Sequence, residues 1–179
     1  MTPHQPSRSS IPLTGGRSFD ILCPESSDFG IEDIALGLSN ICRFTGQVPE
    51  FYSVAQHSVL VSKAVPDEHA FAGLMHDAAE AFIGDVAKPL KVLLPEYAAI
   101  ERRVEAAVFE RFGLRLPLHP CIKEADRILL RTELRDLFGR SDPNCPYSAG
   151  ISPLNGKIEP ISGPEARVLF LQRYHELAA

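Results

Sequence analysis

The segment 70–82 carries three residues whose side chains can bind a metal ion or transfer a proton. They are His76, Asp77 and Glu80, and the residues around them are small or apolar, as in a buried helix. Burying an imidazole and two carboxylates without partners is costly, so another group must pair with them, and a divalent cation is the natural candidate. On a helix His76 and Glu80 share one face, and Asp77 lies at its edge.

Two residues on other predicted helices can complete such a site. His57 lies among apolar residues on the helix expected over 54–64, and Asp126 lies on the helix expected over 120–138. Each also has a simpler interpretation, because His57 alone could be a hydrogen-bonded core histidine and Asp126 alone an ion-pair partner of Lys123 or Arg127. Because His57 and Asp126 occur in the same chain as the polar cluster of the segment 70–82, a metal centre is favoured. Two imidazoles and two carboxylates suit one divalent transition metal (Co²⁺, Mn²⁺, Fe²⁺, Ni²⁺ or Zn²⁺) better than Mg²⁺.

The pattern of the remaining chain predicts helices to position these residues. Apolar residues recur at helical spacing and strand signals are almost absent, which predicts an all-α fold. The expected helices cover about 31–43, 54–64, 67–84, 95–113, 120–138 and 164–177. Ser53 is expected to cap the second of them.

The chain length fits one domain, expected over 18–179. The segment 1–17, rich in proline and serine, is expected to be a flexible N-terminal extension. The segment 139–162 is a long loop rich in proline and glycine. Loops of this length often act as lids, but an ordered surface loop without a chemical role is an equal alternative.

Composition excludes several classes of function. The chain has 179 residues and a net charge of −5, which argues against a general nucleic-acid binder. No apolar run is long enough to span a membrane, and the N-terminus does not resemble a signal peptide, so a cytoplasmic protein is expected.

The scattered cysteines predict free thiols. The remaining histidines are expected at the surface: His4, His69, His119 and His175.

The ordered set of His57, His76-Asp77 and Asp126 resembles the H…HD…D pattern of the HD-domain metal-dependent phosphohydrolases. The segments 38–44, 52–58, 76–85 and 88–91 are similar to the branch that contains the 5′-deoxynucleotidases and their phage-borne and prophage-borne relatives. The resemblance covers about 18–137.

This resemblance implies a helical bundle around a single metal ion, with four ligands: His57, His76, Asp77 and Asp126. Glu80 would position or activate the attacking water, so Glu80 and Asp77 are the implied catalytic residues. Arg43 would bind the substrate phosphate and Asp85 the nucleoside. Further implied substrate contacts are Phe44, where some relatives carry tryptophan, Lys88 and Lys91.

The expected function is therefore that of a metal-dependent 5′-nucleotidase, which releases phosphate from (deoxy)ribonucleoside monophosphates. The expected partner is a small-molecule nucleotide, with no nucleic acid and no membrane. Members of this family are often dimers, which leaves a homodimer open. Two alternatives remain: hydrolysis of another nucleotide (a triphosphate, a cyclic nucleotide or an alarmone), and a nucleotide-binding module that has lost its activity.

Overall fold

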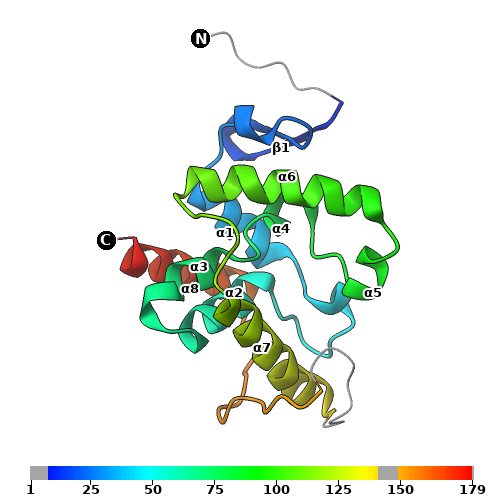
Figure 1. The fold of residues 1–179 in the computed structure, drawn as a ribbon, viewed down its shortest axis with the longest axis vertical. Coiled ribbons are helices and arrows are strands. Elements are labelled where there is room, and N and C mark those ends of the chain that lie inside the picture. The colour runs from blue at the N-terminus through cyan, green and yellow to red at the C-terminus, as the bar shows by residue number, and fades with distance from the viewer. Residues whose placement is uncertain (1–7, 141–148, 179) are drawn as a thin grey trace.

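The computed structural model describes residues 8–140 and 149–178, and this part of the chain is mostly helical, as predicted (Figure 1). The helices are α1 Ile31–Asn40, α2 Val54–Ala64, α3 Ala70–Met75, α4 Glu80–Ile83, α5 Lys88–Lys91, α6 Pro95–Arg111, α7 Pro120–Phe138 and α8 Gly163–Leu177. Two short strands, β1 Ser10–Pro12 and β2 Ser18–Asp20, pair antiparallel near the N-terminus.

Local sequence signals set the ends of several helices. The Ser53 hydroxyl accepts a hydrogen bond from the Gln56 backbone N–H (3.1 Å), which caps α2 as predicted. Helix α7 begins at Pro120 and ends at Phe138, both predicted from the sequence. Proline suits the first turn of a helix, and Gly139 takes the left-handed conformation (φ 62°) that stops it.

Helix α2 is the central element of the fold. It packs against α1, α3, α7 and α8, and side chains on nearly every face of it are buried. Figure 1 shows it between the α3–α8 pair and α7. A histidine on this helix is therefore enclosed by other elements, and His57 is fully buried.

The N-terminal segment differs from the prediction over its described part. Residues 1–7 lie outside the described residues, but Ser10–Pro12 pairs with Ser18–Asp20 instead of forming a flexible extension. The reason is an apolar anchor on β2: Phe19 is fully buried and stacks on Phe82 with 3.9 Å between ring centroids. The resulting hairpin covers one end of the molecule, above α6 in Figure 1.

The predicted helix 67–84 is interrupted where it carries the polar cluster. The α-helix ends at Met75, residues 76–79 form a tight turn, and α4 starts at Glu80. Backbone N–H groups in this turn donate to the carbonyl three residues earlier, as from Glu80 to Asp77 (2.9 Å). Tight turns of this kind inside helices often mark functional sites.

The loop predicted over 139–162 is described only in part. Residues 141–148 lie outside the described residues. The part that is described returns along α7, where Arg135 donates to the carbonyls of Leu154 (2.6 Å) and Gly156 (2.5 Å). Its role as a lid stays a prediction. Among the described residues, no helix combines the length and the apolar character needed to cross a bilayer.

Candidate metal centre

Four predicted ligands come together from three places in the fold. His57 comes from α2, His76 and Asp77 from the turn between α3 and α4, and Asp126 from α7. His57 Nε2 lies 3.2 Å from Asp126 Oδ1 and 3.7 Å from Asp77 Oδ2, and His76 Nε2 lies 3.1 Å from Asp77 Oδ2. Ligand atoms of His57, His76 and Asp77 all lie within 4.8 Å of one another. This is a donor set that can hold a metal ion.

Hydrogen bonds fix which nitrogen each histidine presents to the site. The His76 Nδ1–H donates to the Gly73 carbonyl (2.8 Å), and the His57 Nδ1–H donates to Glu133 Oε1 (2.6 Å). Both imidazoles therefore turn Nε2 toward the carboxylates. Neither Nε2 makes a hydrogen bond within the described residues, although both are buried. Metal-binding histidines are commonly held in this way, by a hydrogen bond from the other ring nitrogen.

Glu133 is a residue of the candidate site that the sequence interpretation missed. It is fully buried on α7, and its second oxygen accepts a hydrogen bond from Arg43 Nη2 (3.1 Å). Although burial raises it, the charges of Arg43 and His57 hold the pKa of Glu133 below its ordinary value, so the carboxylate stays ionised. One sequence feature could have identified Glu133: it lies seven residues, or two helical turns, after Asp126 and so on the same helix face.

The site carries a local excess of negative charge. Four carboxylates act electrostatically on the one guanidinium, that of Arg43: Asp77, Glu80, Asp85 and Glu133. A fifth, Asp126, lies beside His57. Burial and Arg43 lower the pKa of His57, but Glu133 and Asp126 outweigh them and raise it to about 9. The histidines thus bind protons strongly when no metal replaces them. This is the electrostatic environment that attracts a divalent cation.

Asp77 and Glu80 experience opposite pKa shifts. Burial raises the pKa of both carboxyl groups. For Asp77 the adjacent His76, His57 and Arg43 reverse the effect and lower the pKa. For Glu80 the nearby carboxylates Asp77 and Asp85 add to it, so its pKa rises well above the ordinary value. Glu80 Oε2 is buried without a hydrogen-bond partner among the described residues. Asp77 is suited to metal ligation and Glu80 to proton transfer.

Arg43 reaches the site from a strained turn. Beyond its bond to Glu133, its Nη1 lies 3.8 Å from Asp77 Oδ2. The next two residues, Phe44 (φ 56°) and Thr45 (φ 53°), both adopt the left-handed conformation that ordinary side chains disfavour. Such strain persists only where the surrounding structure enforces it, commonly at functional sites. The Phe44 ring lies 5.5 Å from the Arg43 guanidinium and packs edge-on against Phe138.

A cavity of about 570 Å³ opens beside the ligands. It is lined by residues that include His76, Asp77, Glu80, Lys91 and Asp126. This size is in the range of small-molecule binding sites. The Lys91 ammonium at its edge is paired with Glu101 Oε1 at 2.5 Å.

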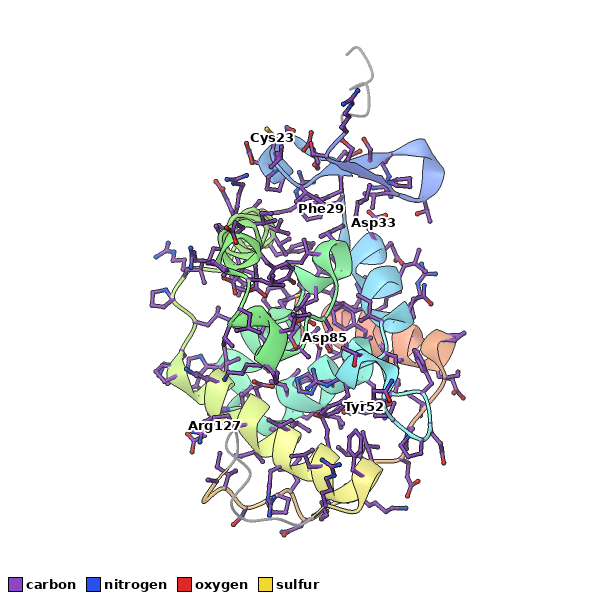
Figure 2. The ribbon with its side chains drawn as sticks, turned by 90° about the vertical axis from the view of Figure 1, so that its right-hand side faces the viewer. Cys23, Phe29, Asp33, Tyr52, Asp85 and Arg127 are labelled. Carbon is purple, nitrogen blue, oxygen red and sulfur yellow. The ribbon has the colours of Figure 1, made fainter. Side chains whose placement is uncertain are left out.

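Four predicted substrate contacts are not among the described residues that line this cavity: Arg43, Phe44, Asp85 and Lys88. Asp85 nevertheless lies close enough to act electrostatically on Arg43 and Glu80. Figure 2 shows Asp85 in the interior of the helical part, whereas Arg127, one residue beyond Asp126, lies at the outer side of α7.

Comparison with known proteins identifies the family to which the chain belongs. No protein-family profile matches it. The uncharacterized protein YfdR of Escherichia coli K12 is 41% identical over 171 residues, which cover 95% of this chain and 96% of that protein. The chain belongs to the YfdR family. An uncharacterized protein of Rhodobacter capsulatus is 33% identical over 189 aligned residues, covering 92% of this chain and 93% of the relative. The similarity to the YfdR family thus extends over nearly the whole chain, including the segments that form the site.

Proposed function

We propose that this member of the YfdR family is a metal-dependent phosphohydrolase of the HD-domain type, and that it removes the phosphate from 5′-nucleoside monophosphates. The observation that carries the proposal is the convergence of two Nε2 atoms with the carboxylates of Asp77 and Asp126 beside a cavity. The ordered H…HD…D pattern of the sequence supports the same reading. We infer that the bound ion is a single divalent transition metal.

The donor set fits such an ion. Both His57 and His76 present a buried Nε2 without a hydrogen bond, and two carboxylate oxygens lie beside these atoms. Imidazole and carboxylate ligands together suit Mn²⁺, Fe²⁺, Co²⁺, Ni²⁺ and Zn²⁺. When bound, the ion would supply Lewis-acid activation of a water molecule and of a phosphoryl oxygen.

The protein's own residues would carry the remaining steps. Glu80 takes a proton from the attacking water, because a carboxylate whose pKa is raised by burial is a stronger base than an ordinary one. The water oxygen bonds to phosphorus, the bond from phosphorus to the sugar oxygen breaks, and that oxygen receives the proton that Glu80 carried. Arg43 donates to the phosphate oxygens, since a guanidinium is charged at any pH the protein meets. The products are a nucleoside and phosphate.

A monophosphate is favoured over more highly charged nucleotides because acidic residues outnumber basic ones in the cavity lining. The acidic residues are Asp77, Glu80, Glu101, Glu105 and Asp126, and the basic ones are Lys91, Arg102 and Lys123. Arg43 is embedded among carboxylates, and Lys91 is already paired with Glu101. A triphosphate would bring several more negative charges into a region of negative potential. The cavity volume likewise matches a mononucleotide.

Phosphate release from a panel of deoxyribonucleoside and ribonucleoside monophosphates tests the proposal. The protein is stripped with a chelator, and Mn²⁺, Co²⁺ or Mg²⁺ is restored in separate reactions. We expect metal-dependent release, with little activity before metal is added. Absence of release across the panel, with bound metal measured by mass spectrometry, would overturn the monophosphatase proposal. Parallel reactions with triphosphates, cyclic nucleotides and alarmones, and nucleotide-binding titrations, would then separate another substrate from a site that binds without turnover.

A further inference from the structure

A second group of metal-binding side chains lies outside the centre described above. His69 ends a short helical turn, Asp67–His69, just before α3, and His119 and Cys121 lie at the start of α7. One ligand atom from each of the three lies within 4.8 Å of the other two. The two imidazoles stack with 4.2 Å between ring centroids, although their residues are fifty positions apart in the sequence.

The chemical state of these side chains suits metal binding. His119 Nδ1 accepts a hydrogen bond from the Cys121 backbone N–H (3.3 Å), so this nitrogen carries a lone pair. Cys121 is a free thiol. Within the described chain the His69 imidazole makes no hydrogen bond and no ion pair, so its ring nitrogens are not committed to another partner. A metal ion would compete with only one hydrogen bond.

The surrounding charge also favours a cation. Two carboxylates, Glu68 and Glu124, lie near Cys121. These negative charges disfavour a thiolate that has no cationic partner. A divalent ion bound to the thiolate would balance them. Ligation would release the thiol proton to solvent.

We propose that His69, His119 and Cys121 form a second metal site that binds Zn²⁺, with water in the fourth position. Two imidazoles and one thiolate are a ligand set typical of zinc. Zinc–nitrogen and zinc–sulfur bonds of about 2.0–2.3 Å place neighbouring ligand atoms roughly 3.3–3.6 Å apart in a tetrahedron. The side chains close the remaining gap by rotating, which their partial exposure permits.

An ion at this position would join two elements of the first centre. His69 immediately precedes α3, which leads to His76 and Asp77, and Cys121 lies on α7, five residues before Asp126. His119 also lines the cavity beside the first centre. The second ion would therefore hold both ligand-bearing segments at a fixed separation. This structural role does not depend on the proposed phosphohydrolase activity.

Cobalt spectroscopy of the full chain distinguishes this site from the first. Co²⁺ bound to a thiolate gives a near-ultraviolet charge-transfer band, whereas the first centre offers only nitrogen and oxygen ligands. We titrate Co²⁺ into reduced, metal-free protein and expect a thiolate band whose final amplitude corresponds to one thiolate-bound Co²⁺ per chain and which Zn²⁺ displaces. Cys121→Ser should abolish the band, and His57→Ala, which alters only the first centre, should leave it intact.

Two further variants complete the test. Replacing even an outer-shell partner of a metal ligand costs about 10–100-fold in affinity, so His69→Ala should weaken the Co²⁺ dissociation constant of this site by at least about tenfold. Cys23→Ser removes an exposed thiol elsewhere and should change nothing. Circular dichroism checks that each variant folds. A wild-type protein without a thiolate band at saturating Co²⁺, or a band that survives Cys121→Ser, would overturn the proposal.

Discussion

Two carboxyl groups three residues apart, those of Asp77 and Glu80, have opposite pKa shifts because their neighbours differ. Asp77 faces the two imidazoles and Arg43, which stabilise its negative charge. Glu80 is buried with one oxygen unpartnered among the described residues, and its nearest charges are negative. Pairs of titratable groups whose pKa values are pushed apart in this way commonly divide ligand and proton-transfer duties.

This division can be tested by comparing Asp77→Ala with Glu80→Ala. Loss of Asp77 removes a ligand, so we expect loss of both bound metal and turnover. Loss of Glu80 leaves the four ligands in place, so we expect metal content near the wild-type value and a kcat reduced by about 10²–10⁴-fold. Metal content is measured by mass spectrometry and turnover by phosphate release. If Glu80→Ala lost as much metal as Asp77→Ala, the assignment of Glu80 to proton transfer would be wrong.

At the scale of elements, close packing between α1 and α4 sets the position of Glu80. A Cβ atom built on Gly37 of α1 would lie 2.7 Å from the Ala81 carbonyl oxygen and 2.8 Å from Ala81 Cβ. Only glycine allows this approach, and Ala81 directly follows Glu80. The separation of the two helices therefore places the carboxylate that we assign to proton transfer.

We expect Gly37→Ala to destabilise the protein by about 1–3 kcal/mol through overpacking. In a helix interior without close neighbours, a glycine-to-alanine change would stabilise the protein by about 1 kcal/mol. The sign of the measured change therefore distinguishes overpacking from the ordinary gain in helix propensity. Turnover should also fall, because α4 must shift. Urea denaturation measures the free energy of unfolding. Gly156→Ala is the matched control, since its Cβ would meet no atom within 4 Å, and it should change stability by less than about 0.5 kcal/mol. A stabilised Gly37→Ala variant would contradict this account.

At the scale of the whole molecule, the proposed first metal centre joins segments that are distant in the chain. It draws on the turn after α1, on α2, on the α3–α4 turn and on α7, and the His57–Glu133 bond spans 76 positions. A ligand that binds only the folded state stabilises that state by mass action. Metal binding should therefore raise the stability of the entire fold.

We expect Mn²⁺ at a hundredfold excess over its dissociation constant to stabilise the metal-free protein by about 2.7 kcal/mol, which raises Tm by roughly 5–11 °C. Mn²⁺ is chosen because it prefers nitrogen and oxygen ligands to thiolates, so it reports on the first centre. Scanning calorimetry with chelator and with Mn²⁺ measures the shift. In Asp126→Ala most of the shift should disappear. An undiminished shift in that variant would place the Mn²⁺ site elsewhere.

The sequence by itself determined the predominance of helix, the cap at Ser53 and the bounds of α7. These features follow from local rules, because helical spacing, caps and proline positions act within about four residues of one another. Residue types and their order also singled out four of the residues that meet in the first centre: His57, His76, Asp77 and Asp126. The metal-ligand and substrate roles of those residues stay predictions. The periodic pattern, however, extended the third helix through His76, where the chain instead makes a tight turn.

Only the tertiary structure decided the partners of these residues. It brought Glu133 to His57 and Arg43, anchored the N-terminal hairpin through Phe19, and stacked His69 on His119. No local pattern carries this information, because each contact joins residues distant along the chain and depends on which helix faces pack together. Burial and charge at the site, and the pKa shifts they cause, arise from the same long-range packing.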